Sequence, residues 1–348
     1  MRRLIRGRLR GSRLAIAIIV CVLFYTEFFI YHLNSKKWQQ LKCTDEDSCV
    51  KIVLVADPQI IGKLNEVIHF LTPFSIWDSD RYLRVTYQSV FNFIKPDIVI
   101  FLGDLFDEGS ISVQHDFSNY VDRLYTIFDI GKSSGIQYIW LPGDNDIGGE
   151  GTDIVTSEKM AKFTRAFPQS DREQYANISF YKINKLVQYV PLIEDNNDFS
   201  NPNIVRVALS HVPIFKGYSS FTKQVVHQLE PHVLFTAHEH KSKVIRTDPN
   251  NLYDRHVEVT DPRNPKKFQY DLNSESVYEF MVPTCSYRMG TMNMGYGYAI
   301  IEGKNIQYTV LWSPVRFPTL IVYGFILILV TLWLLTKACV ILCKKVLK

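Results

Sequence analysis

The central part of this 348-residue sequence lacks an excess of basic residues. The formal net charge is +4, but six arginines lie in residues 1–13 and four lysines lie in residues 337–348, and neither segment contains an acidic residue. Subtracting those ten positive charges leaves −6 for residues 14–336. Because a nucleic-acid-binding surface needs a basic stripe, the composition argues against a nucleic-acid partner.

The sequence also lacks the composition of a disordered or fibrous chain, since 47% of its residues are hydrophobic and 21% are charged. It contains no internal repeat. A chain of this length can form one sizeable domain in addition to membrane segments.

The first long apolar run extends from Leu14 to Tyr31 and is interrupted only by Thr26 and Glu27. It is just long enough to cross a membrane. A basic segment followed by an apolar run is also typical of a cleaved signal peptide. No small-x-small cleavage site follows it, so we predict a retained signal anchor over residues 14–33.

The second run, Thr319 to Thr336, contains no charged residue and is flanked by Arg316 and Lys337. It predicts a transmembrane helix within residues 317–343. Basic ends stay in the cytosol. We therefore predict a cytosolic arm (1–13), a lumenal domain (34–316) and a cytosolic tail (344–348), in a membrane of the ER, its exit sites or the cis-Golgi.

Two features of the central segment suit the lumen. Cys43 and Cys49 could close a small disulfide loop in an oxidising compartment, the alternative being two free thiols. Cys285 would then stay unpaired. Asn177-Ile178-Ser179 is an N-glycosylation sequon, which by itself is a weak signal.

Short runs rich in valine and isoleucine predict buried strands. These runs are Ile52–Ala56, Ile98–Leu102, Gln137–Leu141, Val205–Leu209 and Val233–Thr236. Apolar residues at helical spacing predict helices over Arg81–Lys95, Val113–Ile130 and Ser157–Phe167. This alternation predicts a layered α/β domain. We expect residues 241–279 to be polar and loop-like, either as an excursion over the functional site or as irregular surface structure, and a hairpin to turn at Glu302–Asn305.

Each predicted strand is followed by candidate metal ligands. In chain order these are Asp57-Pro58-Gln59, Gly103-Asp104, Gly143-Asp144-Asn145-Asp146, His211 and His238-Glu239-His240. Polar groups at the ends of adjacent strands converge at one edge of a sheet. Two metal ions held by such carboxylates and imidazoles can hydrolyse phosphate esters. Each motif is weak alone, but five in order are a strong signal.

Other polar residues carry less weight. Glu239 should point away from the His238–His240 pair, and we favour helix capping over a role near the metal for Asp107 and Glu108. The remaining histidines fit no ligand spacing and are predicted to be structural or on the surface. They are His69, His115, His227, His232 and His256.

The five motifs resemble the signature of the calcineurin-like metallophosphoesterases, D-x-H, G-D, G-N-H-D/E, H and G-H-x-H. The segments ADPQIIG, FLGDLFDEG, PGDNDIGGEG and AHEH resemble one branch in particular. It comprises membrane-anchored phosphodiesterases that remodel glycosylphosphatidylinositol (GPI) anchors, and fungal cell-division-control relatives. The resemblance implies a β-sandwich of the four-layer type flanked by helices, with one transmembrane helix near each end.

The resemblance also implies a ligand set for two divalent metal ions, with Mn favoured and Fe, Zn or Mg as alternatives. The first ion would be bound by Asp57, Gln59, Asp104 and His240, and the second by Asp104, Asp144, His211 and His238. Gln59 occupies a position where the family has histidine, and its neutral amide oxygen favours Mn or Mg over Zn.

Asn145 occupies the position of the family's catalytic histidine. An amide has no titratable proton near neutral pH and cannot act as a general acid. Losing such an acid typically slows a reaction about 10²- to 10⁴-fold. The amide could still donate a hydrogen bond to phosphoryl oxygens.

Two main functions follow. The first is removal of ethanolamine phosphate from GPI anchors during maturation and ER-to-Golgi transport of GPI-anchored proteins, with a GPI-type glycolipid phosphate as substrate. The second, suggested by Asn145, is a metal-binding pseudoenzyme that acts as a cargo or assembly factor in ER export, with cargo receptors as partners. A purely structural protein with a decayed site is a third reading that the retained ligands disfavour.

Overall fold

The computed structural model describes residues 2–65, 68–193 and 197–346, which divide into two units. The membrane unit consists of residues 1–36 and 314–348, and the sheet unit consists of residues 37–313. The predicted domain limits of 34–316 lie close to those of the sheet unit.

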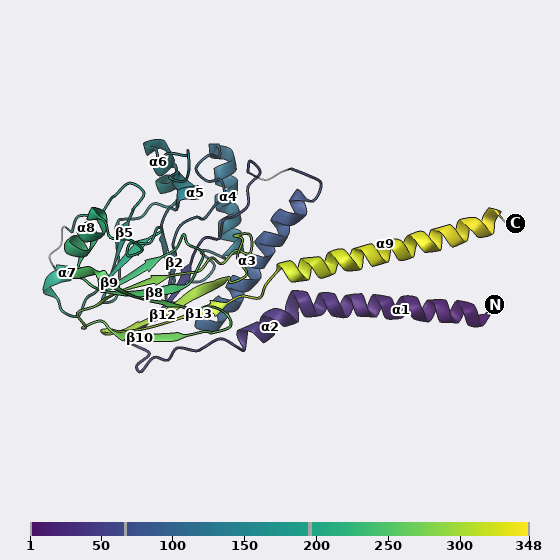
Figure 1. Ribbon diagram of the computed structural model, residues 1–348, viewed down its shortest axis with the longest axis horizontal. Coiled ribbons are helices and arrows are strands. Elements are labelled where there is room, and N and C mark those ends of the chain that lie inside the picture. The colour runs from purple at the N-terminus through teal and green to yellow at the C-terminus, as the bar shows by residue number, and fades with distance from the viewer. Residues whose placement is uncertain (1, 66–67, 194–196, 347–348) are drawn as a thin grey trace. The chain divides into compact units, whose positions relative to one another are not determined.

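The sheet unit contains two β-sheets (Figure 1). In spatial order, the six-stranded sheet consists of β10 (Lys267–Asp271), β13 (Asn305–Trp312), β12 (Gly295–Glu302), β1 (Cys49–Val55), β2 (Ile98–Phe101) and β3 (Gln137–Trp140). The seven-stranded sheet consists of β4 (Arg172–Tyr175), β5 (Ile178–Ile183), β6 (Val205–Ser210), β7 (Val233–Thr236), β11 (Val277–Met281), β8 (Lys243–Asp248) and β9 (Asn251–Val259). The neighbours β1, β2 and β3 are parallel, and so are β5, β6, β7 and β11.

The helices described in the sheet unit are α3 (Thr72–Ile94), α4 (Gln114–Ile127), α5 (Asp144–Ile147), α6 (Ser157–Ala166), α7 (Asn197–Ser200) and α8 (Ser220–Leu229). Helices α3, α4 and α6 pack against the six-stranded sheet, and α8 packs against the other sheet. The layered α/β fold predicted from the sequence is therefore confirmed.

The strand β1 shows why its sequence is apolar without alternation. Ile52 and Leu54 face the core between the two sheets, whereas Val53 and Val55 face the layer of helices. All four side chains are fully buried. A strand covered on both faces needs apolar residues at every position.

The predicted hairpin is confirmed, because β12 and β13 pair antiparallel around the Glu302↔Asn305 turn. The prediction of irregular structure for residues 241–279 is wrong, since β8, β9 and β10 lie in this segment and β11 begins in it. Strand β9 ends its sheet and exposes most of its side chains, so it tolerates polar residues throughout.

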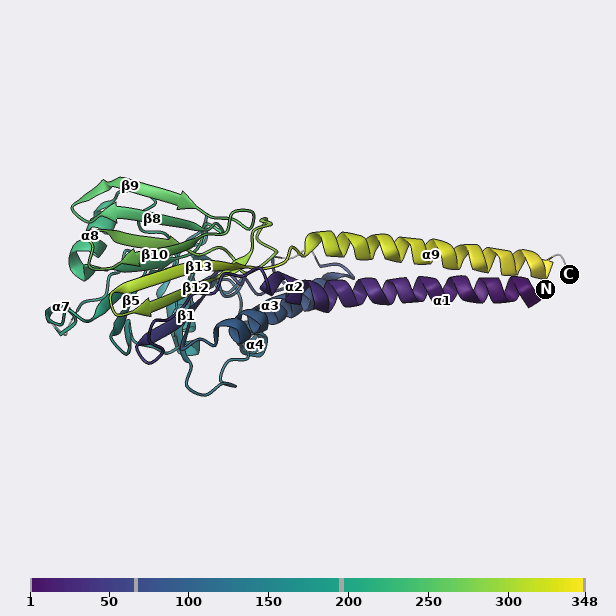
Figure 2. The same cartoon turned by 90° about the horizontal axis from the view of Figure 1, so that it is seen from below.

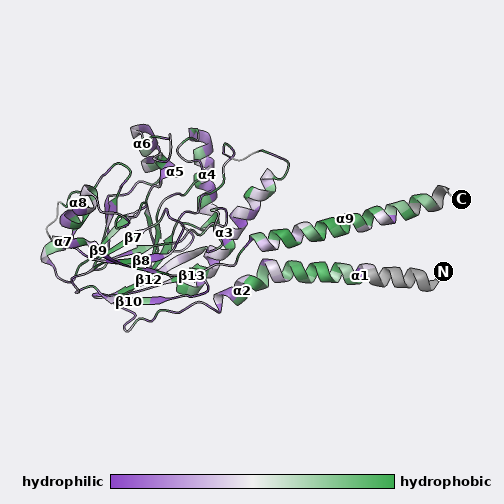
Figure 3. Ribbon diagram, in the orientation of Figure 1, coloured by the Kyte–Doolittle hydropathy of each residue, from purple (hydrophilic) through white to green (hydrophobic). Residues whose placement is uncertain are grey.

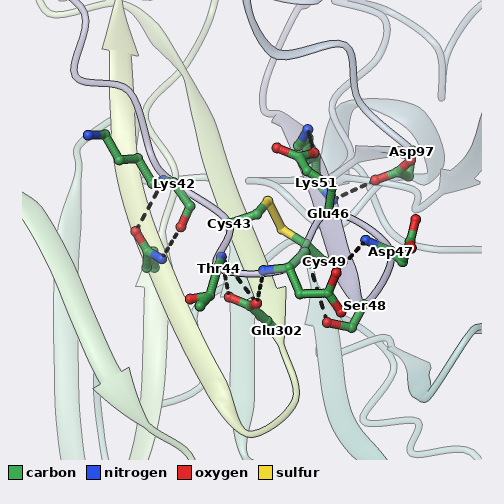
Figure 4. Close-up of a disulfide and its surroundings, with 12 residues drawn as sticks. Lys42, Cys43, Thr44, Glu46, Asp47, Ser48, Cys49, Lys51, Asp97 and Glu302 are labelled. Atoms are coloured by element: carbon green, nitrogen blue, oxygen red, sulfur yellow. Dashed lines mark hydrogen bonds and ion pairs between the residues drawn. A yellow bond between two sulfur atoms is a disulfide. The ribbon is translucent and has the colours of Figure 1, made fainter.

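The sheet unit begins with the expected disulfide between Cys43 and Cys49 (Figure 4). The loop that it closes is held by Glu302 of β12. Its carboxylate accepts the backbone N–H groups of Thr44 at 3.0 Å and Asp45 at 2.7 Å.

The membrane unit contains α1 (Arg2–Phe24), the π-helix η1 (Tyr25–Phe29), α2 (Ile30–Ser35) and α9 (Phe317–Val346) (Figure 2). Two stretches are long and apolar enough to cross a membrane, Ser12–Ser35 and Phe317–Val340 (Figure 3). Their large side chains are exposed, Leu14 by 64% and Phe325 by 61%. Exposed apolar surface of this extent suits lipid rather than water, so a two-pass membrane protein is allowed.

Glu27, the acidic residue of the first apolar stretch, is paired within the membrane unit. Arg316, which is only 3% exposed, donates a hydrogen bond of 2.8 Å to Glu27 Oε1. The Tyr323 hydroxyl also donates to this carboxylate. The charge that interrupts the apolar run is thereby neutralised by a residue at the start of the second helix.

Candidate metal centre

Five strands deliver polar side chains to one edge of the sheet unit. Asp57, Asp104 and Asp144 follow the parallel strands β1, β2 and β3. His211 follows β6, and the His238–His240 segment follows the neighbouring strand β7. Because these strands run in one direction within each sheet, their carboxyl ends bring residues distant in sequence together.

The first cluster consists of Asp144, His211 and His238. Asp144 Oδ1 lies 2.9 Å from His211 Nε2 and 3.0 Å from His238 Nδ1. The other ring nitrogen of His211 lies 2.7 Å from the carbonyl oxygen of Leu102. A proton on Nδ1 donated to Leu102 leaves Nε2 as the nitrogen that faces the cluster.

The second cluster shares His211 and adds Asp57 and Asp104. His211 Nε2 lies 3.4 Å from Asp104 Oδ1, and His240 Nε2 lies 3.9 Å from Asp57 Oδ1. Asp57 Oδ2 is buried and has no hydrogen-bond partner among the described residues. A buried carboxylate oxygen without a donor is costly, and a bound cation would satisfy it.

Two amides surround the Asp104 carboxylate. Gln59 Nε2 and Asn145 Nδ2 both donate to Asp104 Oδ2, at 3.0 and 3.1 Å. The backbone N–H of Asn145 donates to Asp104 Oδ1 at 3.0 Å. The structure therefore places both residues at the cluster, with their amide nitrogens directed at the carboxylate. Their roles as ligand and as reaction partner stay predictions.

The backbone at this edge adopts an uncommon conformation. Five non-glycine residues of the predicted site have left-handed φ angles, and these are Asp57 (48°), Gln59 (41°), Asp104 (52°), His238 (65°) and His240 (56°). Such residues cost free energy and gather at functional sites. The strand ends therefore turn sharply, which directs their side chains into the cluster.

Glycine is required next to Asp104. A Cβ atom added to Gly143 would lie 2.1 Å from Asp104 Oδ1, and one added to Gly103 would lie 2.7 Å from His211 Nδ1. No real side chain fits at these distances. The two glycines allow the ends of β2 and β3 to approach each other and His211.

Burial and charge shift the pKa values of the cluster strongly. Burial raises the pKa of the Asp57 carboxyl to about 8 and also raises the pKa of Asp104. Burial opposes protonation of His211, but the charges of Asp104 and its neighbours outweigh it and raise the His211 pKa to about 10. The cluster gathers more negative charge than its burial favours, which suits binding of cations.

Asp146, which was not among the predicted ligands, holds two strand ends together. Its carboxylate accepts the backbone N–H groups of Leu105, Phe106 and Gly143 at 2.9 to 3.1 Å. Burial raises the pKa of Asp146 to about 7. The resemblance assigned Asp144 of the GDND motif to the ligand set and gave Asp146 no role.

Glu279 is a second residue that the sequence analysis missed. It is fully buried in β11, and its oxygens accept the N–H groups of Ile214 at 2.7 Å and Phe215 at 2.8 Å. Lys185 Nζ donates to the carbonyl oxygen of Pro213 in the same turn. These contacts hold the segment that directly follows His211. The sequence feature that could have indicated this role is a glutamate inside the otherwise apolar run VYEFM.

The predicted helix-capping role of Glu108 is wrong. Its carboxylate accepts the backbone N–H groups of Lys63 and Leu64 at 2.6 Å, as well as the Tyr120 hydroxyl. It therefore holds the loop that follows the Asp57 turn. Glu239, as predicted, points away from the cluster, where it pairs with Lys216 and Lys243.

Among the other histidines, His232 has a structural role. Its Nδ1 accepts the backbone N–H of Arg206 at 3.0 Å. His256 is on the surface and lies 3.8 Å from Glu258. Neither belongs to a candidate metal cluster in the described part of the chain.

Sequence comparisons identify relatives. The sequence profile of the calcineurin-like phosphoesterases matches residues 50–242, more than half of the chain. Metallophosphoesterase 1 homolog of Caenorhabditis elegans is 24% identical over 342 residues, covering 91% of this chain and 89% of that protein. Metallophosphoesterase 1 of Xenopus laevis is 33% identical over 155 residues, covering 43% of this chain and 36% of that protein.

Solved structures of similar proteins are more distant. A metallophosphoesterase from Sphaerobacter thermophilus aligns with 75% of this chain and 87% of its own, at 11% identity and a TM-score of 0.36. The purple acid phosphatase PPD1 of yellow lupin aligns with 75% of this chain and 51% of its own, at 12% identity and a TM-score of 0.46. Scores this low add nothing to the family match.

Proposed function

This chain belongs to the calcineurin-like phosphoesterase family of metal-dependent enzymes, and from that premise we propose that it is a membrane-anchored two-metal phosphodiesterase. One observation carries the proposal. Three carboxylates and three histidines, delivered by five strand ends, lie at one edge of the sheet unit. Asp57 Oδ2, buried without a hydrogen-bond partner among the described residues, gives this edge an atom that a cation would satisfy.

The two proposed metal sites share the Asp104 carboxylate. One takes Asp57, Gln59, Asp104 and His240, and the other takes Asp104, Asp144, His211 and His238. Carboxylate, amide and imidazole donors suit Mn, and also Fe, Zn or Mg. Gln59 would offer its oxygen after a half-turn of the amide that now donates to Asp104. Bound divalent ions would supply positive charge against a phosphate and lower the pKa of a water.

The chain itself would orient the reaction partners. The bond between His211 and the Leu102 carbonyl holds the imidazole with Nε2 toward the cluster. The Asn145 amide would donate a hydrogen bond to a phosphoryl oxygen, in place of a proton. We therefore expect slow turnover that does not depend on a titrating group at position 145.

The proposed substrate is the ethanolamine phosphate of a GPI-type glycolipid, removed on the lumenal side of an early secretory membrane. Support comes from the motifs shared with the GPI-remodelling branch and from two apolar helices. The basic chain ends and the Cys43–Cys49 disulfide favour a lumenal sheet unit between cytosolic termini.

A second candidate function is a metal-binding pseudoenzyme that assists ER export of cargo. The observation that favours it is the hydrogen bond of 3.1 Å that the Asn145 amide donates to Asp104 Oδ2, which engages the amide within the cluster itself. This candidate requires export to continue after the metal site is disrupted. Failure of Asp104→Asn to rescue a knockout would exclude it.

The test measures the metal content of the detergent-purified full chain and its turnover of bis-p-nitrophenyl phosphate with added Mn²⁺. Wild type should bind two ions and turn the ester over, whereas Asp104→Asn should do neither. Asn145→His should raise the rate by about 10²- to 10⁴-fold if it restores a general acid. Wild type that binds metal but shows no turnover above Asp104→Asn would overturn the enzyme proposal and favour the pseudoenzyme.

A further inference from the structure

Asn177 lies in the two-residue turn between β4 and β5, where Tyr175 pairs with Ile178. Its side chain is exposed, as is that of Ala176 before it. Asn177-Ile178-Ser179 is the one N-x-Ser/Thr triplet in the whole sequence. The folded chain therefore exposes Asn177, the acceptor residue of the sequon, at the hairpin tip, whereas Ile178 and Ser179 are buried in β5.

The space beside this turn is open as well. Asn177 lines a cavity of about 670 Å³ together with Tyr175 and the disulfide loop, which contributes Glu46 and Cys49. The volume falls within the range of clefts that hold small molecules. Carboxylates and a tyrosine ring can contact sugar hydroxyls and the faces of sugar rings. The first sugars of a chain attached at Asn177 would have both room and polar partners.

The position also lies beside an edge strand of a sheet. Strand β4 (Arg172–Tyr175) is the last strand of the seven-stranded sheet on this side, in the part of the chain that the structure describes. Edge strands invite pairing with a second chain, and proteins protect them in several ways. A bulky, hydrated group at the tip of the β4–β5 hairpin would obstruct such pairing.

We propose that Asn177 carries an N-linked glycan and that this glycan shields the β4 edge. In the transfer, the Asn177 amide nitrogen forms a bond to the anomeric carbon of a lipid-diphosphate-linked oligosaccharide and loses a proton. The bond from that carbon to the diphosphate breaks, and the lipid diphosphate leaves with the electron pair. The inference shares the lumenal orientation with the proposed function and is independent of the metal chemistry.

The test is expression of the full chain in eukaryotic cells, followed by digestion with peptide-N-glycosidase F and gel electrophoresis. Wild type should lose mass equal to one glycan, and Asn177→Gln should lose none. Glu275→Thr serves as a matched control for topology. It creates a second sequon at Asn273, in an exposed turn of the same unit.

The Glu275→Thr control distinguishes glycosylation at Asn177 from the lumenal orientation of the sheet unit. A glycan on the Glu275→Thr protein alone, with none at Asn177, would overturn the inference and leave the lumenal orientation standing. No glycan on either protein would overturn both. For the shielding role, Asn177→Gln should form more oligomers than wild type in size-exclusion chromatography, and equal profiles would refute it.

Discussion

Replacing Gly143 by alanine should disable the metal centre through a single methyl group. The φ angle of Gly143 is −103°, which any residue adopts, so the backbone itself is not strained by a side chain. The added Cβ, however, would lie 2.1 Å from Asp104 Oδ1 and 2.3 Å from the Asp104 nitrogen. Restoring a contact of 3.0 Å requires a displacement of about 0.9 Å. Asp104 is only 2% exposed, so it has little room to give way.

The magnitude follows from that displacement. Overpacking of a close-packed interior costs about 1–3 kcal/mol of stability. Misplacement of a reacting group by about 1 Å lowers a rate on the order of 10²-fold. Because Asp104 is proposed to bind both metal ions, we expect loss of metal as well as loss of turnover.

The assay compares Gly143→Ala with Gly217→Ala by metal content, thermal unfolding and phosphodiester turnover. Gly217 is the matched control, since no atom lies within 4 Å of its added Cβ and its φ is not positive. The control should behave as wild type. If Gly143→Ala keeps wild-type metal content and rate, the approach of Gly143 to Asp104 does not shape the centre and the reasoning is refuted.

Three further outcomes are expected. Adding Mn²⁺ should raise the melting temperature of wild type but not of Asp104→Asn, because a ligand that binds only the folded state stabilises it; an equal rise in both would place the metal elsewhere. Glu279→Gln should weaken Mn²⁺ binding measured by calorimetry, since a hydrogen bond to a charged group contributes about 1.5–3 kcal/mol and its loss loosens the segment after His211; unchanged affinity would make Glu279 a purely structural residue. Burial, followed by the charges of Lys304 and Arg206, lowers the pKa of His232 to about 4. As the pH falls, His232 is protonated in the unfolded chain before it is protonated in the folded chain. The free energy of unfolding should therefore decrease as the pH drops from about 6.5 to about 4. His232→Asn should flatten that fall, and an unchanged pH profile of unfolding would contradict the assignment.

The strands that carry the candidate site could be predicted because a strand buried on both faces needs an uninterrupted run of apolar residues, which is visible in the sequence. The predicted run Val233–Thr236 coincides with β7. The other four runs match their strands to within three residues at either end. A candidate ligand follows each run within three residues, so the strand ends located the candidate ligands as well.

The supporting carboxylates could not be predicted in this way. Glu279 reaches Ile214 and Phe215 because β11 pairs with β7. The residues around Glu279 contain no pattern from which that pairing could be predicted. Glu108 looked like a helix cap because it precedes a helix by a few residues. Its true partners, the backbone N–H groups of Lys63 and Leu64, are fixed by the packing of two loops.

The strands β8, β9 and β10 were missed for a different reason. They lie at or near the ends of their sheets and are partly exposed, so their residues are largely polar. Pairing with neighbours determines such strands more than their own composition does. The proline-containing turns between them strengthened the impression of a loop.

The place of β1 in its sheet has a consequence for how the protein is made. β1, which leads into Asp57, lies between β2 and β12, and β12 begins only at Gly295. During synthesis, one side of β1 therefore stays open until nearly the whole sheet unit has been translated. Only four residues separate the end of β13 from the second apolar helix. The β12–β13 hairpin that completes this side of the sheet is therefore translated immediately before the second apolar helix. A chain truncated before Gly295 would keep every candidate ligand, yet expose the apolar edge of the strand that positions the first of them.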